Sequence, residues 1–129
     1  MEGLTIQEAA ETTGWSPRML RYIEEAGVLQ VGRTASGYRI YGPAELQRLR
    51  TLRELLTRFE CALSDVAFGR RMATEPDLRS ALERWFEARP EPPAGVASDD
   101  WLRWEQQKHQ RLLAAAAEPS TPQKEKTAA

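Results

Sequence analysis

The chain has 129 residues, of which 41% are hydrophobic and 29% charged, so it has room for one small domain or a compact domain with an appendage. This length excludes a large catalytic barrel, and a single Cys excludes an intramolecular disulfide and a metal site built from Cys alone. The formal net charge of -1 also gives no sign of a nucleic-acid binder.

The charge, however, is distributed unevenly along the sequence. Between residues 14 and 58 there are eight Arg against four Glu, a local excess of +4 inside a near-neutral total. The planar guanidinium group suits bidentate contacts with phosphate and guanine better than an ammonium group does.

The amino-terminal stretch is acidic and no apolar run is long enough to span a bilayer, so we expect a cytoplasmic protein that does not contact a membrane.

The first two predicted elements form a helical corner. A capping-box sequence, Thr-Ile-Gln-Glu, opens a helix that is expected to reach about residue 12. Residues 13–16 then form a turn, because Gly14 adopts positive φ cheaply and Ser16 before a proline is a favourable N-cap. A second helix is predicted over residues 17–26. Two short helices joined in this way are typical of a helix-turn-helix.

A β-hairpin is predicted directly after this corner. Residues 28–31 and 38–41 alternate as short strands do, and the Gly-containing stretch 32–37 joins them. A hairpin that follows a recognition helix acts as a wing beside the DNA backbone. Tyr41 is expected to pack the hairpin onto the helices.

The combination of these residues resembles the N-terminal signature of the MerR family of bacterial transcription regulators. It consists of Leu-Arg-Tyr at 20–22, Gly-Val-Leu at 27–29, Arg33, and Gly-Tyr-Arg-Ile-Tyr at 37–41, and the resemblance covers about residues 4–72. It implies a winged helix-turn-helix with an extra helical pair, in a homodimer joined by a C-terminal antiparallel coiled coil. Such a dimer binds a palindromic operator on double-stranded DNA, and many members distort the promoter spacer for RNA polymerase.

The resemblance also implies which residues contact DNA. Arg18 is the candidate reader of base edges, and the other candidate DNA contacts are Ser16, Arg21, Tyr22, Arg33, Tyr38 and Arg39. Where the family often has two consecutive tyrosines, this chain has Tyr22 followed by Ile23. One aromatic contact with the backbone is therefore expected to be missing.

Two further helices complete the predicted N-terminal domain, residues 1–73. A third helix opens at Pro43, with an inner stripe formed by Leu46, Leu49, Leu52, Leu56 and Phe59. A fourth helix is expected to start at residues 62–66, after a turn that is one residue longer than is usual in the family. Its inner residues are expected to be Leu63, Val66 and Met72.

The C-terminal region, residues 74–117, fits the family pattern least well. One helix is predicted after a capping sequence that starts at Thr74, and another after the cap at residues 98–100. A Pro-rich linker at residues 90–97 separates them. We expect a helical hairpin at the dimer interface or a weaker dimer assisted by DNA, with candidate interface residues Leu78, Leu82, Trp85, Trp101, Trp104 and Leu112.

The remaining reactive residues, one Cys and one His, do not indicate a catalytic or metal-binding site. Cys61 is expected to be a buried, inert thiol, and His109 is expected to be solvated. No metal, cofactor or catalytic constellation is predicted, so the chain is not expected to be an enzyme. The polar tail, residues 118–129, is expected to be disordered.

Two functions from different classes follow from this sequence. The first is a mainly α, winged helix-turn-helix regulator that binds DNA in the nucleoid and whose effector is unknown. The alternative is an architectural or excisionase-like protein of the same design that recruits a protein partner through its aromatic C-terminal helices. The sequence does not decide the operator or the sign of regulation.

Overall fold

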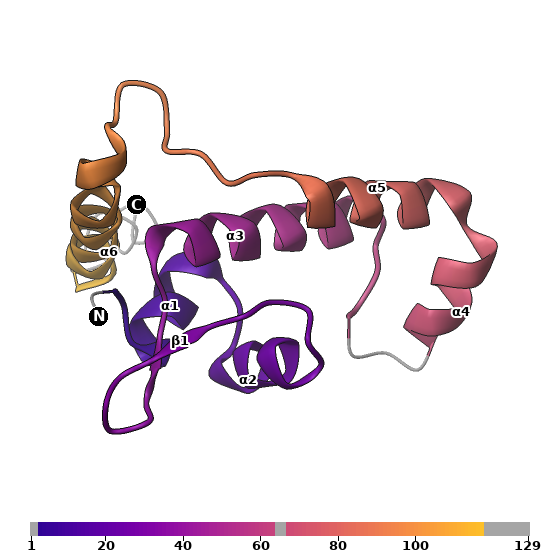
Figure 1. Ribbon diagram of the computed structural model, residues 1–129, viewed down its shortest axis with the longest axis horizontal. Coiled ribbons are helices and arrows are strands. Elements are labelled where there is room, and N and C mark those ends of the chain that lie inside the picture. Colours follow the sequence, from indigo (N-terminus) through magenta and orange to yellow (C-terminus); the bar gives the residue numbers. More distant parts are fainter. Residues whose placement is uncertain (1–2, 64–66, 118–129) are drawn as a thin grey trace, which may run out of the picture.

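The computed structural model describes residues 3–63 and 67–117, which form a mainly helical structure with one small hairpin (Figure 1). The helices are α1 (Ile6–Thr13), α2 (Pro17–Glu25), α3 (Pro43–Arg58), α4 (Ala67–Thr74), α5 (Pro76–Glu87) and α6 (Trp101–Ala117), the strands are β1 (Gly32–Arg33) and β2 (Arg39–Ile40), and a 3₁₀ turn covers Ser98–Asp100. No helix in the described part of the chain has the length and apolarity that a membrane crossing requires. The predicted disordered tail, 118–129, lies outside the described residues.

The helix-turn-helix forms as its capping residues predict. Thr5 and Glu8 make the capping box of α1, each side chain bonding the other's backbone amide at 3.2 and 2.9 Å. Gly14 ends α1 with φ of +86°. The positive φ favours glycine here, and a Cβ atom at Gly14 would also lie 3.0 Å from the guanidinium carbon of Arg53, which would have to shift slightly. Ser16 then caps α2 by accepting a hydrogen bond from the amide of Met19 at 3.1 Å.

The wing is shorter than predicted, and its first strand is displaced along the chain. The antiparallel register pairs Gly32 with Ile40, and the predicted strand 28–31 is wrong. The physical reason is that the Val28 amide bonds the carbonyl of Ile23 to close α2, while Leu29 is buried in the core. Val28 therefore closes the end of α2 and Leu29 packs in the core, so neither residue pairs as a strand of the wing.

Tyr41 is fully buried, in agreement with the prediction that it packs the hairpin onto the helices. Its backbone forms two hydrogen bonds of 2.8 Å with Leu4, one in each direction. This bridge ties the residue before α1 to the end of the wing. The first residues of the fold and the hairpin are thereby held together.

The core is organised around α3. All four predicted leucines of its stripe are buried, together with Leu55, whereas Phe59 is half-buried. α5 runs back along α3, and the chain then returns over the length of α3 to reach α6 (Figure 1). The sequence places Leu78, Ala81, Leu82, Trp85 and Phe86 on one helical stripe of α5. The first four are buried against this core, whereas Phe86 is exposed. The Trp85 indole lies under the Arg48 guanidinium, 4.3 Å from ring centroid to carbon, and donates to the Arg48 carbonyl at 3.0 Å.

The connections around α4 differ from the prediction. Residues 62 and 63 are not helical and the described helix begins at Ala67, while Val66 lies outside the described residues. The chain turns at Glu60 with φ of +49°, and the Cys61 amide bonds the Leu56 carbonyl at 2.8 Å. Cys61 is half-buried and not buried as predicted. The N-cap of α5 is Glu75 and not Thr74, because Thr74 still belongs to α4.

The Pro-rich linker is fixed to α3 by polar contacts. Gln47 forms hydrogen bonds with both the amide and the carbonyl of Glu91, and Arg48 donates to the Ala88 carbonyl at 3.0 Å. Residues 98–100, predicted as a cap, form a 3₁₀ turn that leads into α6. The linker therefore delivers α6 to the opposite end of α3 from α4 (Figure 1).

α6 packs on α1 and α3 of the same chain through charged side chains. Glu105 is only 1% exposed and accepts two hydrogen bonds from Arg50, at 2.6 and 2.9 Å. His109 is also buried, and its Nε2 lies 2.8 Å from a carboxylate oxygen of Glu11, so the prediction of a solvated His109 is wrong. The hydrogen bond with His109 lowers the pKa of the Glu11 carboxyl below its ordinary value.

Removal of Arg50 should strongly destabilise the fold. Arg50→Met leaves the Glu105 carboxylate buried without its partner, and we expect the free energy of unfolding in urea to fall by about 3 kcal/mol. A double variant, Arg50→Met with Glu105→Leu, should recover most of that loss because no charge then stays unpaired. Arg103→Met, which removes an exposed charge from α6, is the control and should change stability little. Equal losses in the two single variants would contradict the importance of this pair.

Candidate nucleic-acid interface

α2 presents a polar face to the solvent. Leu20 and Ile23 turn inward and are buried, whereas Arg18, Arg21 and Tyr22 are exposed. This division follows from the helical period, since residues three or four apart share a face. The outward face of the second helix of the helix-turn-helix is thus available for a ligand, with an arginine in its first turn.

Ser16 has a structural task at the start of this helix. Its hydroxyl accepts the hydrogen bond that caps α2, which fixes where the helix begins and so where Arg18 emerges. The structure therefore places Ser16 beside the exposed face of α2 and shows it as a cap.

The wing is attached to α2 by ion pairs on Glu24. One carboxylate oxygen of Glu24 accepts from Arg33 at 3.0 Å and from Arg39 at 2.5 Å. Arg39 also lies 3.7 Å from a carboxylate oxygen of Glu25. With two guanidinium groups on one carboxylate, the hairpin is held against the last turns of the helix.

These bonds leave the predicted DNA contacts of the wing exposed to different extents. Tyr38 is 72% exposed, and Arg33 is exposed although it bonds both Glu24 and the Gly37 carbonyl. The Arg39 side chain, in contrast, is only 17% exposed. Tyr38 and Arg33 therefore present polar groups to the solvent, whereas Arg39 mainly joins the wing to α2.

A pocket of about 360 Å³ is lined by residues of the wing, of α2 and of the start of α1. Its wall contains Arg21 from the helix together with Arg33, Tyr38 and Arg39 from the hairpin. Four of the seven predicted DNA contacts thus surround one depression, and three of them are guanidinium groups. A surface of this composition attracts phosphate groups.

Sequence reasoning missed the role of Glu24. In the sequence, Glu24 enters only the count of net charge. The numbers of residues that separate it from Arg33 and Arg39 match no helix or strand period, so no pattern links the three. Only the folded hairpin brings the three side chains together.

Within residues 3–63 and 67–117, no group of three His, Cys, Asp or Glu side chains is arranged to hold a metal ion.

The predicted dimer residues lie apart from this face, and four of them are occupied within the chain. Leu78, Leu82 and Trp85 are buried in the core under α5, and Trp101 is buried at the start of α6. Trp104 is half-buried, and Leu112 is the exposed member of the set. An interface with a second copy would have to use other side chains than the four buried ones in this conformation.

The fold and this face define a winged helix-turn-helix, the architecture of a DNA-binding domain. Residues 4–63, a little under half of the chain, match the family model described as MerR HTH family regulatory protein, so this part of the chain is similar to the helix-turn-helix domains of that family. That family model describes regulatory proteins.

Curated relatives agree with this assignment. Over 51 residues, the chain is 43% identical to an uncharacterized HTH-type transcriptional regulator, PA4778, of Pseudomonas aeruginosa and 41% identical to the HTH-type transcriptional regulator HmrR of Sinorhizobium medicae. Each match covers 39% of this chain but only 39% and 35% of the respective relative. The chain therefore matches little more than a third of the length of each of these relatives, and no solved structure matches it.

Loss of the Glu24 carboxylate should loosen the wing. Glu24→Gln removes the acceptor shared by Arg33 and Arg39, and hydrogen bonds to a charged group contribute roughly 1.5–3 kcal/mol each. We expect the hairpin amides to exchange with deuterium about tenfold faster, as measured by NMR. Glu25→Gln is the matched control, since Glu25 is exposed and its carboxylate lies 3.7 Å from Arg39. Similar exchange in both variants would show that Glu24 does not hold the wing.

Proposed function

We propose that the protein is a sequence-specific DNA-binding regulator of transcription that acts as a homodimer on a palindromic operator. The observation that carries this proposal is the exposure of Arg18 and Arg21 on α2, next to an arginine-bearing wing. The names of the relatives as transcriptional regulators favour this function over the excisionase-like alternative.

The geometry of α2 suits insertion into a major groove. The groove is about 12 Å wide and admits a helix whose first turns face the base edges. Arg18 emerges in the first turn, where a guanidinium can bond guanine through two atoms. Arg21, Tyr22, Arg33 and Tyr38 lie further along the helix and on the wing, where donors meet the phosphate backbone.

A second copy is needed for useful affinity. The local excess of +4 between residues 14 and 58 is modest, and a dimer doubles the number of phosphate contacts. Leu112 and Leu113 are exposed large apolar residues on α6, and we place the dimer contact there. The buried residues of α5 stay in the core of each protomer.

The finer features of the regulator follow from its family. We propose that it acts in the cytoplasm on nucleoid DNA and that it distorts a promoter spacer to assist RNA polymerase.

One relative is named as a heavy metal-dependent transcription regulator of Rhizobium meliloti. We do not extend that dependence to this chain, whose sequence holds one Cys and one His.

Two substitutions on α2 should separate base recognition from backbone binding. An operator is first selected from random DNA, and affinities are then measured by fluorescence anisotropy over a range of salt concentrations. Arg18→Ala should cost about 1–3 kcal/mol on the operator and little on random DNA. Arg21→Ala should weaken both alike and flatten the salt dependence by about one unit of slope.

Arg84→Ala is the control for these variants, because it removes an exposed charge from α5, on the other side of α3 from α2 (Figure 1). It should leave both affinities unchanged. If it weakened binding as much as Arg18→Ala, the DNA-binding face would not be α2. Failure of the wild-type chain to select any sequence would contradict specific recognition.

The dimer proposal is tested on α6. Changing Leu112 and Leu113 together to Ala should convert the dimer to a monomer in sedimentation velocity, because the exposed apolar contact is lost. Phe86→Ala, which removes an exposed aromatic side chain from α5, should leave the dimer intact. A dimer that survives the double change would place the interface elsewhere.

A further inference from the structure

A helix in the major groove of DNA lies between two phosphate backbones, one at each edge of the groove. In the proposed function the wing and Arg21 bind the backbone at one edge, because Arg21 lines the pocket next to the hairpin. A side chain that binds the backbone at the other edge must lie on the opposite flank of α2. Contacts with both edges would fix how deep the helix enters and which base pairs it reaches.

The ion pairs of Glu24 define the flank of α2 that faces the wing. At about 100° per residue, Met19 projects about 140° away from Glu24 around the helix axis, on the other flank. Met19 lines a pocket of about 260 Å³ together with Trp15, which precedes α2, and Arg53 from α3. Arg18 projects between these two flanks. Arg53 therefore borders α2 on the side opposite the wing.

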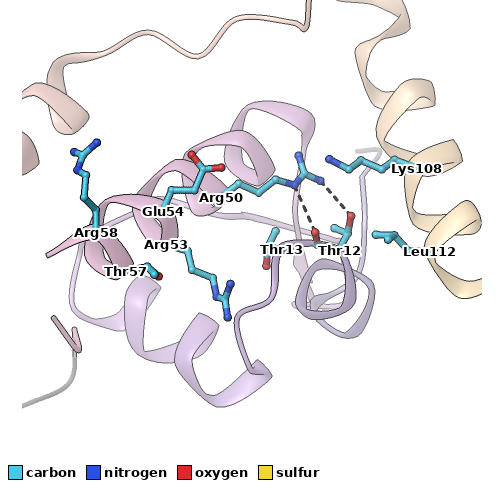
Figure 2. A pocket seen from close by; sticks show the side chains of 9 residues that line it. All are labelled: Thr12, Thr13, Arg50, Arg53, Glu54, Thr57, Arg58, Lys108 and Leu112. Carbon is cyan, nitrogen blue, oxygen red and sulfur yellow. Dashed lines mark hydrogen bonds between the residues drawn. The ribbon is translucent and has the colours of Figure 1, made fainter. Parts of the chain in front are cut away.

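The guanidinium group of Arg53 lies over the turn that leads into α2. A Cβ atom at Gly14 would be 3.0–3.1 Å from three of its atoms. Figure 2 shows the side chain of Arg53 pointing from α3 toward this turn. Arg53 is exposed, and it has no ion-pair partner within 4.0 Å among residues 3–63 and 67–117. Its positive charge is thus available to a ligand beside the first residues of α2.

Other arginines of α3 are engaged within the chain. Arg50 binds the carboxylate of Glu105, and Arg58 stacks over the ring of Phe59, 5.5 Å from its centroid. In Figure 2, Arg58 points in the opposite direction from Arg53. Of these three arginines, only Arg53 combines a charge that no carboxylate of the described residues pairs with and a position at the start of α2.

We propose that Arg53 binds a phosphate of the DNA backbone at the groove edge opposite the wing. The planar guanidinium group can bond two phosphate oxygens at once, which suits it to this contact. The helix α2 is then held from both sides, with Arg18 positioned over the base edges between them. This inference rests on the proposed DNA-binding function, and it adds a positioning residue that lies outside the helix-turn-helix and the wing.

Ethylation interference on the selected operator tests this contact. Ethylation neutralises a phosphate, so it blocks a protein whose side chain contacts that phosphate, and a variant without this side chain becomes insensitive there. We expect Arg53→Ala and Arg21→Ala each to lose sensitivity at a single phosphate in every half-site. The two phosphates should lie on opposite strands, across the same major groove. Loss at one shared phosphate, or no loss in Arg53→Ala, would overturn the proposal.

The salt dependence of binding gives a second readout. Arg53→Ala should weaken binding to the operator and to random DNA alike, by about tenfold, and should flatten the salt dependence by about one unit of slope. Arg53→Lys should restore the slope, because an ammonium group on a phosphate releases counterions as a guanidinium group does. The free energy of unfolding in urea should change little, since Arg53 is exposed. A large loss of stability with an unchanged slope would show that Arg53 only covers the turn, and would overturn the proposal.

Arg58→Ala is the matched control, because it removes an exposed charge from the same helix on a side chain that points away from the turn (Figure 2). It should keep the wild-type slope and the wild-type pattern of interference. An equal effect of Arg58→Ala would mean that net charge alone decides the affinity, against the proposed contact. Failure of the wild-type chain to bind DNA would overturn the proposed function as well, whereas a wild-type chain that binds while Arg53→Ala keeps every contact would overturn this inference alone.

Discussion

The arrangement of this protein depends on the bidentate contact between Arg50 and Glu105. Glu105 is almost completely withdrawn from solvent, and a buried carboxylate without a partner is costly, so α6 is stable only where Arg50 meets it. Arg50 also bonds the hydroxyl of Thr12 at the end of α1. One side chain on the central helix thereby fixes the last helix against the first, and the contact between His109 and Glu11 adds a second connection along α6.

The same principle operates on a smaller scale at the candidate DNA interface. Glu24 holds Arg33 and Arg39, and so sets the angle of the wing against α2. Charges in this chain therefore have two tasks. Some, such as Arg18 and Arg21, face the solvent and are free to meet DNA, while others orient one element against another. A count of charges along the sequence does not separate the two groups, because it does not show that Arg39 bonds Glu24 within the chain.

Intramolecular packing also determines which apolar side chains are exposed to contact a second copy of the chain. The prediction that Leu78, Leu82, Trp85 and Trp101 form a dimer interface treated their helical stripes as unpartnered. The linker, fixed on Gln47, folds these helices back onto α3 and α1, so the stripes meet the core of their own chain. Leu112 and Leu113 near the end of α6 stay exposed, as does Phe86 on α5.

The sequence by itself determined the local elements. The capping box at Thr5, the Ser16 cap, Gly14 and the leucine stripe of α3 act within a few residues. The family resemblance, given for about residues 4–72, rests on short motifs within residues 20–41, and the family model matches residues 4–63. Tertiary structure decided which elements touch. The pairs Arg50–Glu105 and Glu11–His109 join residues that are 55 and 98 positions apart, so no period or motif connects them. His109 was expected in solvent for this reason: its partner Glu11 lies on α1, and only the folded chain brings α1 and α6 together.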